Sequence, residues 1–88
     1  MDVRPIEVFD ETPNAAVVRM PNRRFPGVVV QGDSLRILLE QAREIQKRVA
    51  GNTDEELAGE TDNLVSKLAA WSSHYEAVLA RHGIGLPY

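Results

Sequence analysis

Residues 28–49 read VVVQGDSLRILLEQAREIQKRV, and this stretch holds the change from strand to helix that decides the fold. A valine triplet, Val28–Val30, packs well on a pleated sheet and poorly in a helix. The Gly-Asp-Ser sequence at residues 32–34 then offers a turn and a helix N-cap. Beyond it, apolar residues recur at alternating spacings of three and four, as on the buried face of a helix: Leu35, Leu38, Ala42, Ile45 and Val49. We therefore predict a strand followed by a first helix over residues 33–50.

The segments before this stretch add two further strands. Val3–Phe9 and Ala15–Met20 are both rich in residues that favour strands. A Thr-Pro-Asn sequence separates them, and Pro21 ends the second strand because proline has no amide hydrogen to donate to a sheet. Connections this short favour antiparallel pairing. We therefore predict a three-stranded antiparallel sheet within residues 1–32.

The segment after the first helix predicts a second, longer helix over residues 53–83. Thr53 and Glu56 have the spacing of a capping box, and Gly83 is a suitable stop signal. Gly59 is a point at which the helix could break. Its apolar positions again follow helical spacing: Leu57, Thr61, Leu64, Leu68, Trp71, Tyr75 and Val78. We expect Trp71 and Tyr75, which lie four residues apart on this stripe, to be in the core, with dimer contact as the alternative.

The predicted fold class is thus α+β, with the order β-β-β-α-α. The chain has 88 residues, room for one domain over residues 1–88 with residues 84–88 as a tail. It has no cysteine, which excludes disulfides and thiolate zinc sites. Its start, MDVRPIEV, does not resemble a secretory leader, and no stretch approaches the roughly 18 apolar residues of a membrane span. We expect a cytoplasmic protein that does not contact a membrane.

The sequence contains no recognisable catalytic or metal-binding motif. It has no Gly-x-Ser-x-Gly, no P-loop and no Gly-x-Gly-x-x-Gly pattern. The candidates for acid–base chemistry are His74, Glu76 and His82. On a helix His74 and Glu76 point about 200° apart, so they do not converge. We predict that the protein is not an enzyme and binds neither a cofactor nor a metal.

The loop between Pro21 and Pro26 contains the most function-like residues. Arg23, Arg24 and Phe25 combine two arginines with an aromatic ring on a stiff loop. Such groups are typical of the residues that dominate protein interfaces. The structural alternative is that Phe25 packs under the sheet edge while the arginines are merely solvated.

The net charge of −3 conceals one strongly acidic segment. Residues 52–62 contain five acidic residues and no basic one. Asp54, Glu55 and Glu60 could dock on a basic partner such as a nuclease, since complementary charges steer association. The structural alternative, which we favour, is that acidic residues here stabilise the start of the second helix.

One part of the chain, residues 15–48, resembles HicB-type antitoxins. The resemblance consists of a proline-glycine pair, a short strand, a glycine turn and a patterned helix, formed by Pro26, Gly27, Gly32, Ser34, Leu35, Leu39, Glu40, Gln41 and Ala42. It implies a β-β-β-α unit of the kind that grips a small RNase toxin. Ile37 and Leu38 depart from the family pattern, and the second helix replaces an expected strand. The C-terminal half is similar to small uncharacterised bacterial proteins, which implies no activity.

Together these observations predict a protein-binding module that inhibits a partner protein by occlusion, as antitoxins and immunity proteins do. The expected contact residues are Arg23, Arg24 and Phe25, followed by Asp54, Glu55 and Glu60. A first alternative is a structural or regulatory homodimer whose second helices pair through Leu64, Leu68, Trp71 and Tyr75. A second is an RNA-binding module, which the charge balance disfavours because four arginines stand among five acids in residues 1–33.

Overall fold

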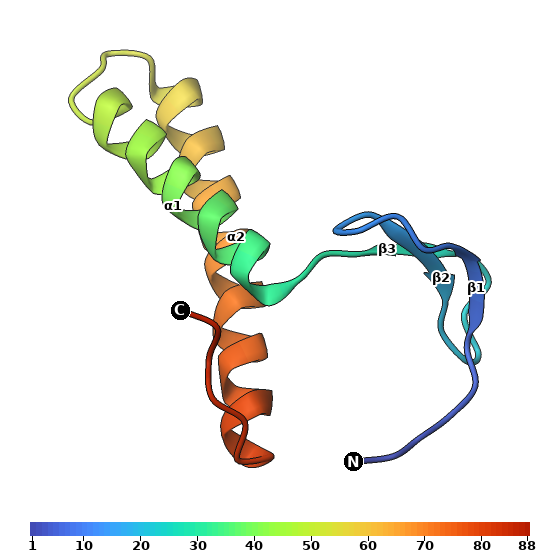
Figure 1. Ribbon diagram of the computed structural model, residues 1–88. Coiled ribbons are helices and arrows are strands. Elements are labelled where there is room, and N and C mark those ends of the chain that lie inside the picture. Colours follow the sequence, from blue (N-terminus) through green and yellow to red (C-terminus); the bar gives the residue numbers. More distant parts are fainter. The chain divides into compact units, whose positions relative to one another are not determined.

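The computed structural model describes residues 1–88 and confirms the predicted fold class. A three-stranded antiparallel sheet precedes two helices, of which the second is the longer (Figure 1). The chain divides into two compact units, Met1–Gln31 and Gly32–Tyr88. The first unit contains all the strands and the second contains both helices. The prediction of a single domain over residues 1–88 stays a prediction.

The first unit is an antiparallel meander with the strand order β1-β2-β3. Its strands are β1 (Glu7–Asp10), β2 (Ala16–Arg19) and β3 (Gly27–Val29). The first two are shorter than predicted, and the third begins one residue earlier than the valine triplet. The register pairs Val8 with Val18 and Val18 with Gly27, and β1 contains an irregularity between Val8 and Asp10. Of the strand residues only Val18 is buried. The small core of this unit is therefore formed by the central strand. Both edge strands leave apolar side chains exposed.

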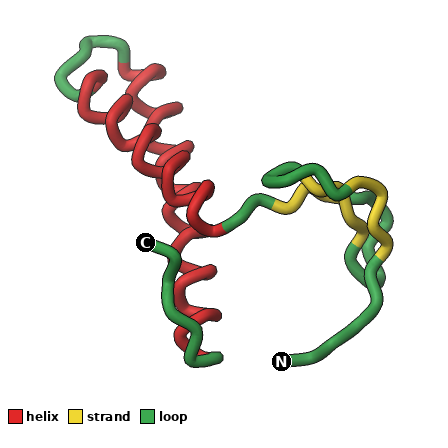
Figure 2. The backbone as a smooth tube through the Cα atoms, viewed as in Figure 1, coloured by secondary structure: helices red, strands yellow, loops and turns green.

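The second unit is an antiparallel helical hairpin (Figure 2). Helix α1 (Gly32–Val49) has 18 residues and helix α2 (Glu55–Arg81) has 27, so α2 extends beyond the segment that α1 covers. Leu39, Ala42 and Val65 form the core of the hairpin, with Leu68 and Ala69 packed against it. At the loop end, the Gln46 side-chain amide donates to Asp62 at 2.9 Å. Neither helix combines the length and apolarity needed to cross a membrane.

The helix ends follow the predicted chemistry with two corrections. Helix α1 begins at Gly32, so Ser34 lies in its first turn rather than at the N-cap. The N-cap of α2 is Asp54 and not Thr53. The backbone is still extended at Asp54, the residue before the helix begins, and the Asp54 carboxylate accepts from the Leu57 amide at 3.1 Å.

The C-terminal end of α2 confirms the predicted glycine stop. Helix α2 continues unbroken through Gly59 and ends where Gly83 adopts a positive φ of 66°. The Ile84 amide donates to the Leu79 carbonyl at 3.0 Å, and the Gly83 amide donates to the Ala80 carbonyl at 3.2 Å. These two hydrogen bonds form a Schellman motif, which satisfies carbonyls at the helix end.

The buried stripe of each helix differs from the predicted one. In α1 the structure buries Leu39 and leaves Leu38 and Ile45 exposed. In α2 it buries Val65 and Ser72, one position along from the predicted Leu64 and Trp71, which are exposed. One residue of each predicted stripe is nevertheless buried, Ala42 in α1 and Thr61 in α2. The prediction that Trp71 belongs to the core is therefore wrong. The physical reason is that each helix has one helical neighbour, which covers a narrower arc than the apolar residues occupy.

Two small residues allow the helices of the hairpin to approach closely. Gly32 is buried against Tyr75, and a Cβ atom added at Gly32 would overlap the tyrosine ring. Ser72 is also buried, and its hydroxyl has no hydrogen-bond partner. An unpaired buried hydroxyl lowers stability, so Ser72 is tolerated for its size rather than for its polarity.

Candidate functional site

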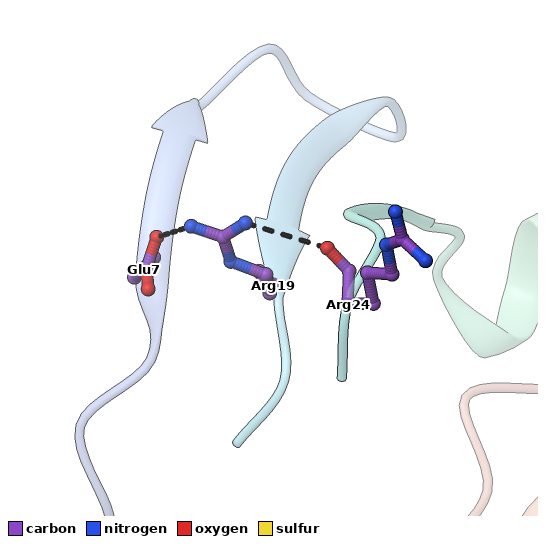
Figure 3. Close-up of polar contacts among 3 residues, drawn as sticks. All are labelled: Glu7, Arg19 and Arg24. Carbon is purple, nitrogen blue, oxygen red and sulfur yellow. Dashed lines mark hydrogen bonds and ion pairs between the residues drawn. The ribbon is translucent and has the colours of Figure 1, made fainter. Parts of the chain in front are cut away.

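The loop that joins β2 to β3 is held in shape by Arg19. Its guanidinium forms an ion pair with the Glu7 carboxylate and donates to the Arg24 carbonyl at 3.4 Å (Figure 3). The same guanidinium lies 5.5 Å from the centroid of the Phe9 ring, within the range of a cation–π contact. Arg19 on the central strand thus ties together β1 and the loop, which was not predicted.

The loop presents the three predicted contact residues together, and we call Arg23, Arg24 and Phe25 the Arg-Phe loop. Phe25 is 74% exposed, so the alternative that it packs under the sheet edge is wrong. The Arg24 guanidinium lies 5.4 Å from the centroid of the Phe25 ring and steadies it without covering it. Neither Arg23 nor Arg24 forms an ion pair. The loop therefore offers an apolar ring and two uncompensated positive charges to a partner.

The backbone of the Arg-Phe loop is a defined turn. The Arg23 amide donates to the Met20 carbonyl at 3.2 Å, and Asn22 between them has a positive φ of 64°. Asparagine tolerates this left-handed conformation better than most residues do. An open depression of about 310 Å³ adjoins the turn, lined by Pro5, Ile6, Glu7, Arg19, Met20, Pro21, Asn22 and Arg23.

The predicted acidic contact residues lie at the start of α2, in the other unit. The Asp54 side chain caps α2, which agrees with the alternative that acidic residues in this segment stabilise the start of the helix. Glu55, in the first turn, and Glu60 are exposed and form no ion pair. Two of the three predicted acidic side chains are therefore free to meet a partner.

The residues predicted for a homodimer divide into two groups. Leu64 and Trp71 are exposed, whereas Leu68 packs against the hairpin core and Tyr75 packs against Gly32. A groove of about 350 Å³ along the hairpin is lined by Leu38, Gln41, Ala42, Ile45, Leu64 and Leu68. Sequence reasoning missed the part that α1 plays in this surface, because it assigned Leu38 and Ile45 to the core.

A signal in the sequence could have shown which apolar residues face outward. Leu38 is followed by Leu39, and Leu64 is followed by Val65. Consecutive helical residues point about 100° apart, so a single neighbouring helix covers only one member of each doublet well. Each doublet therefore marks a helix with a wider apolar arc than one neighbour can bury.

Hydrogen bonds from the Thr12 side chain and backbone hold the pKa of the exposed Asp10 carboxyl below its usual value. No group of three or more histidine, aspartate or glutamate side chains is placed to hold a metal ion. The exposed features described above are the Arg-Phe loop, the start of α2 and the hairpin groove.

These two units define a small α+β protein in which a three-stranded meander precedes a helical hairpin. The chain belongs to a family of unknown function, DUF6959, whose model matches residues 1–88. No curated protein and no solved structure matches the chain. The comparisons do not link it to HicB-type antitoxins, and that resemblance stays a prediction.

Proposed function

We propose that the protein is a non-enzymatic binding module that inhibits a partner protein by covering it, in the manner of an antitoxin or immunity protein. The observation that carries this proposal is the Phe25 ring, which is 74% exposed on a loop fixed by Arg19 and steadied by Arg24. An exposed aromatic ring beside two arginines has the composition of the anchors that dominate interface energies.

The chemistry of this surface favours a protein over a nucleic acid as the partner. Val28 and Val29 on the edge strand β3 follow the loop in sequence and are exposed on opposite faces of the sheet, so the strand after the loop also presents apolar side chains. The Arg19 guanidinium forms an ion pair with the Glu7 carboxylate, so Arg23 and Arg24 are the positive charges left on this surface to bind phosphates. The site fits a partner surface with an apolar pocket for Phe25 and carboxylates for Arg23 and Arg24. A small nuclease toxin is the partner class that the HicB resemblance implies.

Co-expression with the product of the neighbouring gene tests this proposal. We expect that product to inhibit growth when expressed alone, and to co-purify with the protein when the two are expressed together. Replacing Phe25 with alanine should weaken the complex by about 30-fold, the usual effect of removing one strong interface anchor. The pair of changes Arg23→Glu and Arg24→Glu should weaken it further.

Arg43→Glu is the matched control, because Arg43 is an exposed arginine of α1 that forms no ion pair. This control should leave the complex intact. A neighbouring product that is harmless alone and does not co-purify would contradict the proposal, as would a complex that survives both changes in the Arg-Phe loop.

A further inference from the structure

The helical hairpin exposes a continuous apolar surface that is separate from the Arg-Phe loop. Six large apolar side chains of its two helices are between 42% and 61% exposed. Ile37 is one of them and points about 100° away from Leu38 around α1. We call the other five the second apolar face: Leu38, Ile45, Leu57, Leu64 and Trp71. The groove described above joins Leu38 and Ile45 of α1 to Leu64 of α2. Residues from both helices therefore contribute to one surface.

The position of this face on each helix matches that in a four-helix bundle. Within each helix its members are seven residues apart, which is about two turns, so they form a straight row. The row lies about 80° around the helix from the residues buried inside the hairpin. Two apolar faces at nearly a right angle are what a helix with two neighbours needs, whereas a helix in a lone hairpin needs one.

Charged residues beside Leu64 indicate what covers the face. Glu60 and Lys67 share a shallow depression on α2 with Leu64, and neither forms an ion pair within the chain. Glu60 lies four residues before Leu64 and Lys67 lies three residues after it. Leu57 and Trp71 lie seven residues before and after it. A second copy of this row running in the opposite direction would therefore place apolar side chains against apolar ones and the acidic residue near the basic one.

We propose that the second apolar face pairs with the same face of a second copy of this chain, forming an antiparallel four-helix bundle with its two-fold axis at Leu64. In this arrangement Leu57 faces the partner's Trp71. Glu60 lies within one residue of the level of the partner's Lys67, an offset of about 1.5 Å that two long side chains can span. In a parallel arrangement Glu60 and Lys67 of the two copies would lie on opposite sides of the interface and could not pair, because both residues flank the row on the same side. The proposed inhibitory site is the Arg-Phe loop, so either proposal can fail without the other, but in the dimer Glu60 is paired with the partner's Lys67 and no longer free to contact another partner.

The area of the face is sufficient for a stable homodimer. Its five side chains leave roughly 500 Å² of apolar surface bare in each copy, when about half of each large side chain is counted. A standard interface buries about 800 Å² per partner, of which about 65% is apolar in homodimers, again roughly 500 Å².

Sedimentation equilibrium of the full chain tests the proposal. We expect a species of twice the 9.8 kDa chain mass at micromolar concentration. Leu64→Glu places two like charges at the symmetry axis and should weaken dimerisation at least 100-fold. Arg43→Glu, on an exposed position outside the second apolar face, should leave it unchanged. Circular dichroism of each variant checks that the hairpin stays helical.

A charge exchange distinguishes the antiparallel pairing from other interfaces. Glu60→Lys and Lys67→Glu should each weaken the dimer about tenfold, because two symmetric pairs change from attraction to repulsion. The double variant should regain the original affinity, since it restores both pairs. A monomeric wild type, a Leu64→Glu variant that still dimerises, or a double variant weaker than either single change would overturn the proposal.

Discussion

Replacing Gly32 with alanine tests the contact that fixes the open end of the hairpin. Gly32 has no positive φ, so alanine meets no backbone strain there, but its Cβ would overlap the Tyr75 ring. The ring must swing away and lose roughly 50 Å² of buried surface, which lowers the free energy of unfolding by about 1 kcal/mol. Gly59 is the matched control, because a Cβ there meets no atom within 4 Å. Gly59→Ala should raise stability by about 1 kcal/mol, since α2 continues through this residue.

The free energy of unfolding should therefore lie about 1 kcal/mol below the wild type in Gly32→Ala and about 1 kcal/mol above it in Gly59→Ala, a difference of about 2 kcal/mol between the two variants. Urea unfolding followed by circular dichroism measures this difference, and with a slope near 1 kcal/mol/M the two midpoints should lie about 2 M apart. Protein concentration must be equal in all samples, because dimerisation contributes to apparent stability. In a Tyr75→Ala background the cost of Gly32→Ala should nearly vanish. A stabilising Gly32→Ala, or an equal cost in both backgrounds, would refute the proposed Gly32–Tyr75 contact.

Three further predictions address other parts of the chain. Ser72→Ala should raise the free energy of unfolding in urea by about 1 kcal/mol, because it removes an unpaired buried hydroxyl; a loss of stability would show that the hydroxyl is satisfied. Asp10 should titrate below its ordinary pKa in carboxyl NMR, so the stability it contributes is present above about pH 4 and lost as the pH falls through its lowered pKa. Thr12→Ala should raise that pKa only part of the way to the ordinary value, because the backbone amide of residue 12 still donates to the carboxylate. Phe25→Ala should change the thermal midpoint little, because the ring is mostly exposed; a large drop would assign Phe25 to the fold.

The order of the elements could be predicted because local chemistry determines it. Val28–Val30 favours a strand, and the glycine turn that follows favours a helix start, whatever the rest of the chain does. The stop at Gly83 is equally local, since the left-handed conformation there suits glycine. The cap of α2 was placed one residue early because Thr53 and Asp54 can both cap a helix, and the sequence does not show which of them adopts the extended backbone.

The buried faces could not be predicted because they depend on tertiary neighbours. A stripe of apolar residues shows that a helix has an apolar arc, but not how much of it one neighbouring helix covers. Leu38 and Leu64 belong to the predicted stripes and are nevertheless exposed. The role of Arg19 was also missed, because its partner Glu7 lies twelve residues away and meets it through the strand register. The exposed loop was easier to predict, since Phe25 is flanked by turn-forming residues.

The fluorescence of Trp71 tests most directly whether a second copy covers the apolar surface of the hairpin. Trp71 is the single tryptophan of the chain and lies at the edge of the second apolar face, 61% exposed in one copy. On dilution we predict that its emission shifts to longer wavelength as the dimer dissociates, and that Leu64→Glu shows the longer wavelength at every concentration. An emission maximum that is independent of concentration and equal in the two proteins would contradict the account.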